Sequence, residues 1–474
     1  MIWELDIQTI VMLTNLEEKG RVKCHQYWPD DKVTIPGSVK VSIQEQLELA
    51  DYAVRTFSLK RSGSKEERIV KQFHYTTWPD FGVPEHPTPV LRFTRRILSS
   101  DQQEAGPIVV HCSAGVGRSG TFITLHSQLQ RIASEATIDI FPFVRQMRYR
   151  RCHMVQTEPQ YVFIHDALLE AVECGDTEVV ARDLKIQYRK LSSASEGNPT
   201  KRLIEDEFKK IDDSIHLKTD HVAGQAPANK AKNRYANILP FDGSRCRISA
   251  IPGQEGSDYI NASYVDGYLK QKAYVATQGP LPDTAAEFWR MVWELKSATI
   301  VMLVKEREQG RVKCHHYWPD TGAETFNQYQ VVAHATNDYQ EYTLREFKLV
   351  DKKDNSSLPV RHFQFSTWPE GGNVPENSAG LIDLIGQIQK WQQHSGNKPI
   401  IVHCSGGSGR TGTYIAISML LDRLKVEGVV DVFQTVRALR LQRMHMVQSL
   451  VQYEFCYKTV LEFLDSFELY SNFK

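Results

Sequence analysis

The sequence lacks the features that mark several large classes of protein. Its eight cysteines are widely spaced and include no Cys-X2-Cys pair, which argues for reduced thiols and against a disulfide framework or a zinc site. No apolar run reaches the ~18–20 residues of a membrane helix, and Met1–Asp6 lacks the charged and apolar regions of a signal peptide. Lys plus Arg equals Asp plus Glu at 57 each, so no net charge favours nucleic acid or an anionic membrane. We therefore expect a soluble chain with no membrane segment and no nucleic-acid partner.

Two copies of one short pattern are present instead. A histidine and a cysteine are followed, after five residues, by an arginine at His111–Gly120 (HCSAGVGRSG) and again at His403–Gly412 (HCSGGSGRTG). In each copy an apolar run precedes the cysteine, and an apolar segment of helical character follows the arginine. This order predicts a strand, a tight loop and a helix.

Such a loop has a definite chemistry. Its successive backbone N–H groups, with the free N–H groups at the helix N-terminus, favour a dianion such as phosphate. Arg118 and Arg410 can each grip two phosphoryl oxygens in a bidentate fork. The same positive field lowers the pKa of a thiol from about 8.5 to roughly 3.5–7.5. We therefore predict that Cys112 and Cys404 are thiolate nucleophiles aimed at phosphorus.

The remaining loop residues are predicted to surround the phosphate. They are Ser113, Ala114, Gly115, Val116 and Gly117 in the first copy, and Ser405, Gly406, Gly407, Ser408 and Gly409 in the second.

The repeat extends far beyond the two loops. Thr9–Asp30 matches Thr299–Asp320, and TTWPD at Thr76–Asp80 matches STWPE at Ser366–Glu370. Collinear repeats of this length indicate duplicated domains. The second copy contains KNRY (Lys232–Tyr235), DYINAS and QGP before its MVWEL segment, whereas the first copy begins at the equivalent MIWEL. We therefore expect a first domain truncated at its N-terminus, in a chain that is either a fragment or an incomplete gene model.

The predicted organisation is a first domain over residues 1–174, a linker over 175–200 and a second domain over 201–470. Short apolar runs such as Ile10–Leu13 alternate with longer helical patterns such as Tyr161–Val172. This mixture favours the α/β (α+β) class, with each domain a twisted mixed sheet flanked by helices. The phosphate loop would lie at a helix N-terminus in both domains.

The motifs together resemble one family. KNRY, DYINAS, QGP, YWP, WPD, HCSAGxGRSG and MVQTxxQY follow one another as in the protein tyrosine phosphatases. The tandem arrangement, with EGSDYINAS and the ending LDSFELY, resembles the cytoplasmic half of the LAR-like receptor class. The loop alone is shared with rhodanese-like and arsenate-reductase-like proteins, whereas seven motifs in order are specific. KNRY and the long domain make a dual-specificity phosphatase a weaker alternative.

The resemblance implies hydrolysis of phosphotyrosine on proteins through a phosphocysteine, in a signalling role, without metal or cofactor. Asp80 would be the general acid and then the base for water. Gln156, with Gln160 beside it, would orient that water. Ser119 would hydrogen-bond the departing thiolate, and His111 would help to hold the loop. The alternative for Asp80 is an ordinary turn aspartate.

Glu18 and Lys23 match the loop that braces the arginine and the acid in this family; the alternative is a solvated charged turn. The resemblance also implies a location: cytoplasmic for the chain as written, and the inner face of the plasma membrane for a fragment of a receptor. Phosphotyrosine proteins are the expected partners, and contacts between domains, within or between chains, are an open possibility.

The second copy departs from the pattern at its acid. Glu370 replaces aspartate, and the loop around it is one residue longer than in the first copy. A misplacement of about 1 Å can cost on the order of 100-fold in rate, so we expect weak but measurable activity. Tyr235 would stack on the substrate ring or, alternatively, only cover the sheet. The residues expected in supporting roles are Thr411, Gln448 and Gln452.

Two readings of function follow. In the first, the chain is a protein tyrosine phosphatase whose second domain is weak or regulatory. In the second, the truncated first domain does not fold, and the chain is a pseudophosphatase or a phosphotyrosine-binding scaffold. A redox-sensing role for Cys404 is a side hypothesis, because accessible thiolates of low pKa oxidise readily.

Overall fold

The computed structural model describes residues 1–30, 39–63, 65–80, 82–100, 106–195, 198–215, 220–371 and 374–471. The chain divides into two compact units, Met1–Asp176 and Thr177–Lys474, and each is described by itself. Among the described residues no helix is long and apolar enough to cross a bilayer.

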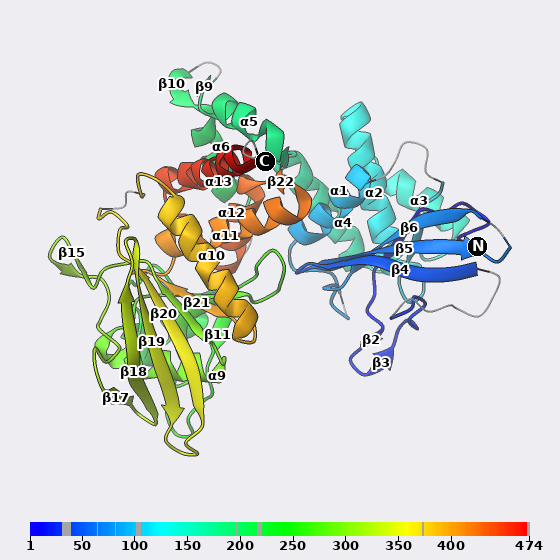
Figure 1. Cartoon of the computed structure of the whole chain (residues 1–474). Helices are drawn as coiled ribbons and strands as arrows, with labels where there is room; N and C mark the ends of the chain where they lie inside the picture. Colours follow the sequence, from blue (N-terminus) through cyan, green and yellow to red (C-terminus); the bar gives the residue numbers. More distant parts are fainter. Residues whose placement is uncertain are drawn as a thin grey trace. The chain divides into compact units, whose positions relative to one another are not determined.

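The first unit is built on a five-stranded mixed sheet (Figure 1). Strands β4, β5 and β6 pair antiparallel, and β6, β1 and β7 pair parallel. All four residues of β1 (TIVM) are buried, as expected for a strand covered on both faces. In spatial order the strands are β4 (Val39–Glu48), β5 (Tyr52–Arg61), β6 (Glu67–Tyr75), β1 (Thr9–Met12) and β7 (Val109–His111).

Helices flank this sheet, and a short hairpin, β2 (Glu17–Glu18) and β3 (Arg21–Val22), follows β1. Helix α2 begins inside the phosphate-loop pattern and packs against α1, α3 and α4. Phe122, Leu125 and Leu129 of this helix are buried, because α2 is the central helix of this layer. The helices are α1 (Thr88–Ser100), α2 (Gly117–Glu135), α3 (Ile140–Arg150) and α4 (Glu158–Cys174).

The second unit repeats this plan with a nine-stranded mixed sheet. Strand β21 lies in its interior between β13 and β14, both of which pair parallel with it. In spatial order the strands are β11 (Arg245–Arg247), β12 (Tyr259–Val265), β13 (Tyr274–Thr277), β21 (Ile400–His403), β14 (Thr299–Met302), β20 (Ser357–Phe365), β19 (Tyr342–Asp351), β18 (Tyr329–Asp338) and β17 (Ala323–Phe326).

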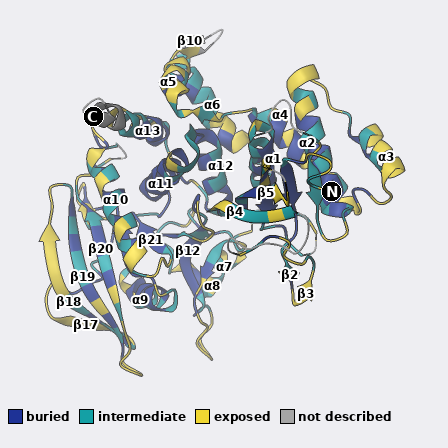
Figure 2. Ribbon diagram, turned by 45° about the vertical axis from the view of Figure 1, so that its right-hand side comes forward, coloured by how far each residue is buried: buried dark blue, intermediate teal, exposed yellow. Residues whose placement is uncertain are grey.

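A second hairpin, β15 (Arg307–Glu308) and β16 (Arg311–Val312), matches the first. Helix α11 is central and buried almost all round, whereas α3 of the first unit is mostly exposed (Figure 2). Besides the helix and 3-10 turn of residues 181–191, the described helices of the second unit are α6 (Leu203–Asp213), α7 (Val222–Gln225), α8 (Pro227–Lys230), α9 (Ala285–Glu294), α10 (Ala379–His394), α11 (Gly409–Glu427), α12 (Val432–Gln442) and α13 (Leu450–Ser471), with a 3-10 turn η2 (Pro282–Thr284). The predicted α/β class, with helices flanking mixed sheets, is confirmed.

The segment predicted as a linker, residues 175–200, carries secondary structure over much of its length. Strand β8 (Val179–Val180) pairs with β22 (Val429–Val430) of the second unit. A 3-10 turn η1 (Ala181–Asp183), helix α5 (Leu184–Leu191) and the strands β9 (Ala194–Ser195) and β10 (Asn198–Arg202) follow. Most of this segment therefore belongs to the second compact unit, and the domain limits taken from the sequence stay predictions.

The two units differ beside the strand that leads into the phosphate loop. Among the described residues, β7 pairs only with β1, whereas β21 pairs on both sides. Above the sheet of the second unit, Phe288 and Trp289 of α9 pack against Tyr317. The equivalent face of the first unit holds a cavity of about 220 Å³ lined by apolar side chains that include Trp3, Trp28 and Phe57. The described part of the first unit therefore has an open apolar face and a free strand edge.

Candidate active sites

In each unit the cysteine lies between the strand and the helix that the sequence predicts. Cys112 follows β7, and the backbone N–H of Gly115 donates to its Sγ at 3.2 Å. Cys404 follows β21, and the N–H of Gly407 donates to its Sγ at 3.3 Å. Both glycines have φ of 72°, a left-handed conformation that side chains disfavour. The loop sequence therefore turns its own N–H groups toward the sulfur.

The Cys112 thiol lies in an environment that favours the thiolate. Burial raises its pKa, but the Ser119 hydroxyl and the N–H groups of Ser119, Gly115 and Val116 stabilise the anion, and the net result is a lowered pKa. Ser119 Oγ is buried and makes no other hydrogen bond among the described residues. Its hydroxyl is therefore available to the sulfur.

The clamp arginine is held from behind by a buried carboxylate. Arg118 Nη1 and Nη2 donate to the two carboxylate oxygens of Glu18 at 2.7 and 2.8 Å, and also to the carbonyls of Leu13 (3.0 Å) and Pro79 (3.1 Å). The Glu18 side chain is only 4 % exposed. It is therefore no solvated turn residue: it fixes the plane of the guanidinium that would face phosphate.

The second unit repeats the same clamp. Arg410 donates to Glu308 at 2.6 and 2.9 Å, to the Leu303 carbonyl at 3.1 Å and to the Pro369 carbonyl at 3.0 Å. Phosphate binding by this loop should therefore not depend on the exchange of its acid.

Glu18→Gln is expected to remove a stabilising interaction that depends on pH. Burial raises the pKa of Glu18, but the Arg118 hydrogen bonds and charge prevail and lower it from 4.5 to about 2. A carboxyl group whose pKa is lower in the folded state than in the unfolded state stabilises the fold at pH values above its unfolded pKa. This stabilisation is lost as the pH falls through its folded pKa. The free energy of unfolding of wild type should exceed that of the variant above pH 4.5, and the gap should close toward pH 2. Urea titrations across this range measure it; a gap that does not change with pH would contradict the prediction, and the exposed neighbour Glu17→Gln is the control.

The two acid candidates have different partners. Lys23 Nζ lies 3.1 Å from Asp80 Oδ1 in the first unit. In the second unit the longer Glu370 side chain accepts a hydrogen bond from the Gln309 backbone N–H at 2.9 Å. The inserted loop residues and Phe81 lie outside the described residues. The exchange of aspartate for glutamate therefore comes with a different anchor for the carboxylate.

The two glutamines of each copy lie against the start of the helix that follows the loop. A Cβ placed on Gly117 would lie 2.8 Å from Gln160 Nε2 and 3.2 Å from Gln156 Oε1. Gln160 Oε1 accepts from the Gln156 N–H, and Gln160 also closes a capping box with Thr157 at the start of α4. Gln160 is thus held in place by helix capping, while the Gln156 amide is not used in this way.

The corresponding pair of the second unit is arranged alike. A Cβ on Gly409 would lie 3.1 Å from the Gln452 amide and 3.3 Å from Gln448 Oε1, and Gln452 Oε1 accepts from the Gln448 N–H at 2.9 Å. The hydroxyl of Thr411 is buried without a hydrogen-bond partner among the described residues, like that of Ser119.

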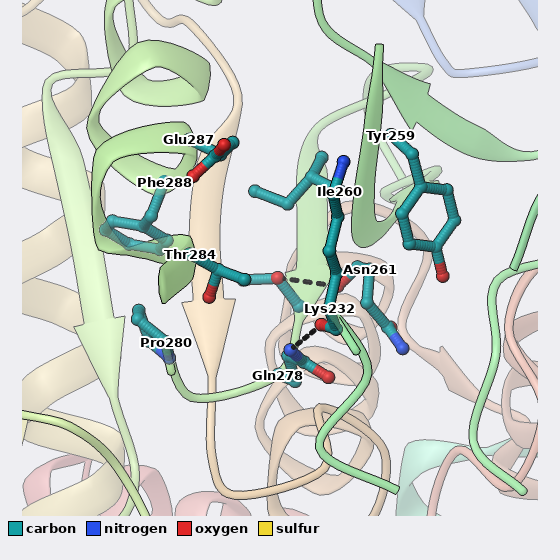
Figure 3. Close-up of a pocket in the computed structure, with 10 residues that line it drawn as sticks. Lys232, Tyr259, Ile260, Asn261, Gln278, Pro280, Thr284, Glu287 and Phe288 are labelled. Carbon is teal, nitrogen blue, oxygen red and sulfur yellow. Dashed lines mark hydrogen bonds between the residues drawn. The ribbon is translucent and has the colours of Figure 1, made fainter. Parts of the chain in front are cut away.

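Tyr235 lies over the phosphate loop of the second unit. Its hydroxyl is 2.9 Å from Ser405 Oγ, and its ring lies 3.4 Å from where a Cβ on Gly406 would be. Gln278 holds the KNRY segment: its Nε2 donates to the Lys232 carbonyl at 2.8 Å (Figure 3). Its Oε1 accepts from the backbone N–H of Arg234 at 2.8 Å. KNRY and QGP are therefore parts of one structure, and Tyr235 contacts the phosphate loop of the second unit.

Sequence reasoning missed an arginine that supports each loop from the far side. Arg443 is fully buried and donates to the carbonyls of Gly407 (2.7 Å) and Gly406 (3.1 Å). Burial lowers its pKa to about 10. The equivalent Arg151 is exposed and donates to the Ala114 carbonyl at 3.1 Å. Both arginines precede MVQ by the same distance, and this recurrence was the available signal.

Comparison with known proteins agrees with this geometry. A family model described as "Protein-tyrosine phosphatase" matches residues 1–170 and 229–462. The chain is 51 % identical over 472 residues to receptor-type tyrosine-protein phosphatase S of Gallus gallus, covering 99 % of this chain and 31 % of the relative. It is 49 % identical to tyrosine-protein phosphatase Lar of Drosophila melanogaster (100 % and 23 %), and 47 % identical to receptor-type tyrosine-protein phosphatase alpha of Mus musculus (100 % and 57 %).

The chain spans about a third or less of the length of the S-type and Lar relatives. Both of its phosphate loops lie within the matched residues. The chain therefore belongs to the protein-tyrosine phosphatase family.

Proposed function

We propose that this chain hydrolyses phosphotyrosine in proteins through a phosphocysteine, with Cys112 as the main nucleophile. The observation that carries the proposal is the combination at the start of α2: a cysteine of lowered pKa and an arginine held by a buried glutamate. One group supplies the nucleophile and the other binds the transferred phosphoryl group.

In the first step the Cys112 sulfur attacks phosphorus and the bond from phosphorus to the tyrosine oxygen breaks. Arg118 exchanges the Pro79 carbonyl for phosphate and binds two of the equatorial oxygens through Nη2 and Nε, and Asp80 gives its proton to the departing phenolate. Lys23, 3.1 Å from Asp80, positions the carboxyl group.

In the second step water attacks the phosphocysteine and the bond from sulfur to phosphorus breaks. Asp80, now a carboxylate, takes the proton of the water that Gln156 orients. The Ser119 hydroxyl stabilises the departing thiolate. Every proton is thus returned, and neither step calls on a metal or cofactor.

For the second unit we propose weak turnover or a regulatory role. Its clamp matches that of the first unit, and Tyr235 would stack on the substrate ring. Glu370 is the reason for slow chemistry, since its carboxylate is anchored at Gln309 and a misplaced acid costs on the order of 100-fold in rate. The relatives are named receptor-type, so we further propose action on phosphotyrosine proteins at the inner face of the plasma membrane, with contacts between the two domains in regulation.

Covalent trapping tests the proposal. The chain is mixed with a phosphotyrosine peptide or with the same peptide carrying phosphoserine, quenched in acid within milliseconds and analysed by mass spectrometry. We expect phosphate on Cys112 with the phosphotyrosine peptide, a smaller amount on Cys404, and phosphate release. Peptide binding without phosphocysteine or release would instead identify a phosphotyrosine-binding scaffold, and equal trapping from phosphoserine would contradict the substrate class.

A further inference from the structure

In the first unit a chain of hydrogen bonds runs from the phosphate loop into the sheet. His111 Nδ1 lies 3.2 Å from the Cys112 carbonyl, and its Nε2 lies 2.7 Å from the Tyr27 hydroxyl. Gln72 Nε2 donates to the same hydroxyl at 2.8 Å, and Arg55 donates to Gln72 Oε1 at 2.9 Å. Gln72 is fully buried, and no group of the proposed reaction uses it directly.

The direction of every bond in this chain is determined by its two ends. A guanidinium only donates, so the Gln72 atom beside Arg55 is the amide oxygen and the amide NH2 points to Tyr27. A carbonyl only accepts, so His111 carries its proton on Nδ1 and its Nε2 accepts from Tyr27. Burial raises the pKa of Tyr27 to about 12, so the hydroxyl keeps its proton and can donate it.

The second unit builds the same chain with a different residue. His403 Nδ1 lies 3.3 Å from the Cys404 carbonyl, and its Nε2 lies 2.7 Å from the Tyr317 hydroxyl. Here His362 Nε2 is 2.9 Å from that hydroxyl, and its Nδ1 is 3.5 Å from Arg345. Nδ1 of His362 must accept from the guanidinium, so Nε2 donates to Tyr317. Imidazole and amide thus present the same donor and the same acceptor to the same neighbours.

Glutamine and histidine are exchanged in the opposite sense two residues further along strands β6 and β20. His74 of the first unit sits where Gln364 lies in the second, just as Gln72 sits where His362 lies. His74 Nδ1 faces the guanidinium of Arg55 and its Nε2 lies 2.8 Å from the Thr14 carbonyl. Gln364 presents its oxygen to the equivalent arginine and its NH2 to the equivalent carbonyl. Side-chain identity changes at both positions, while the direction of hydrogen bonding is kept.

We propose that Gln72, and His362 in the second unit, are positioning residues of the phosphate loop: by donating to Tyr27 or Tyr317 they oblige the tyrosine to donate to the loop histidine. The histidine then keeps its proton on Nδ1 and donates it to the carbonyl of the nucleophilic cysteine. The proposal rests on the proposed function for its consequence in catalysis. The arrangement itself is independent of whether the chain turns over substrate.

Gln72→Glu reverses the direction of the chain with almost no change in volume. Beside Arg55 the glutamate stays ionised and only accepts, so Tyr27 donates to it and no longer to His111. His111 must then shift its proton to Nε2, which leaves a lone pair facing the Cys112 carbonyl. Losing one such hydrogen bond corresponds to a rise of about 0.4 to 1 in the pKa of Cys112. Gln72→His keeps both the donor and the acceptor, and should leave that pKa in place.

The experiment is alkylation of the full chain by iodoacetamide as a function of pH, with Cys112 and Cys404 followed as separate peptides by mass spectrometry. We expect Gln72→Glu to raise the pKa of Cys112, and Gln72→His and the double exchange Gln72→His/His74→Gln to behave as wild type. Tyr27→Phe removes the link between Gln72 and His111 but leaves the Cys112 carbonyl to hold the proton on Nδ1, so the pKa of Cys112 should stay near that of wild type, and adding Gln72→Glu to Tyr27→Phe should have no further effect. Cys404 is the internal control.

An unchanged Cys112 profile in Gln72→Glu would overturn the proposal, as would a rise in the pKa of Cys112 when Gln72→Glu is added to Tyr27→Phe. So would an equal rise in Gln72→His and Gln72→Glu, because it would show only a site intolerant of substitution. If Gln72→Glu fails to fold, the matched exchange His362→Glu in the second unit, followed at Cys404, decides. Alkylation requires no hydrolysis, so a chain that fails the phosphotyrosine test can still pass or fail this one.

Discussion

Cys112→Ser is expected to reduce phosphate release from a phosphotyrosine peptide by at least about 100-fold. A serine hydroxyl is not ionised at neutral pH. The groups that stabilise the Cys112 thiolate cannot supply a nucleophile once the sulfur is absent. The remaining turnover would come from Cys404, whose acid is the longer Glu370. Steady-state kcat/KM for one peptide, measured for wild type and variant at the same pH, gives the result.

The matched variant is Cys404→Ser, which should leave most of the turnover, while the double variant should leave none. A loss of most activity in Cys404→Ser would reverse the assignment of the main catalyst. Retained peptide binding in all three variants would show that the loops still fold and bind phosphate.

Arg443→Met is expected to destabilise the second unit by about 3–5 kcal/mol. Besides the two loop carbonyls, Arg443 donates to Asn261 Oδ1 at 2.8 Å and to Ser263 Oγ at 3.1 Å. The substitution leaves these acceptors buried without a donor, and each such group costs about 1–3 kcal/mol. Because Gly406 and Gly407 are among the acceptors, the phosphate loop should lose order together with stability.

The same substitution at the equivalent position of the first unit is the control. Arg151 is exposed and holds the single carbonyl of Ala114, so Arg151→Met should cost less than about 1 kcal/mol. Urea unfolding gives the stabilities, and hydrogen exchange of residues 403–412 and 111–120 reports each loop. Equal effects of the two substitutions would contradict the prediction.

Much of the candidate site could be predicted from the sequence, because its parts are contiguous. Cys112, the turn at Gly115 and Arg118 lie within seven residues between a strand and a helix, so the chain itself brings them together. Strand β1 lies within one residue of the apolar run Ile10–Leu13, and β7 and α2 flank the loop in the predicted order, because short buried parallel strands and a long apolar helix have distinct patterns.

The supports of the site could not be predicted, because they come from distant segments. Glu18 reaches Arg118 across a hundred residues, and the sequence alone left it open as a solvated charge. Gln72 carries no pattern of its own, and its counterpart His362 is a different residue type. Their equivalence is seen only in the structure, where each lies within hydrogen-bond distance of a tyrosine hydroxyl.

The sequence by itself determined the family and the exchange of aspartate at Asp80 for glutamate at Glu370, and it predicted the two nucleophiles, since each depends on residue type and local spacing. The tertiary structure decided how each loop is held: Arg443 has acceptors on β12 that the described part of the first unit does not offer to Arg151. The physical reason is that a hydrogen bond depends on the relative orientation of its donor and acceptor as well as on residue type. Direction is set only when strands far apart in the chain bring donor and acceptor together.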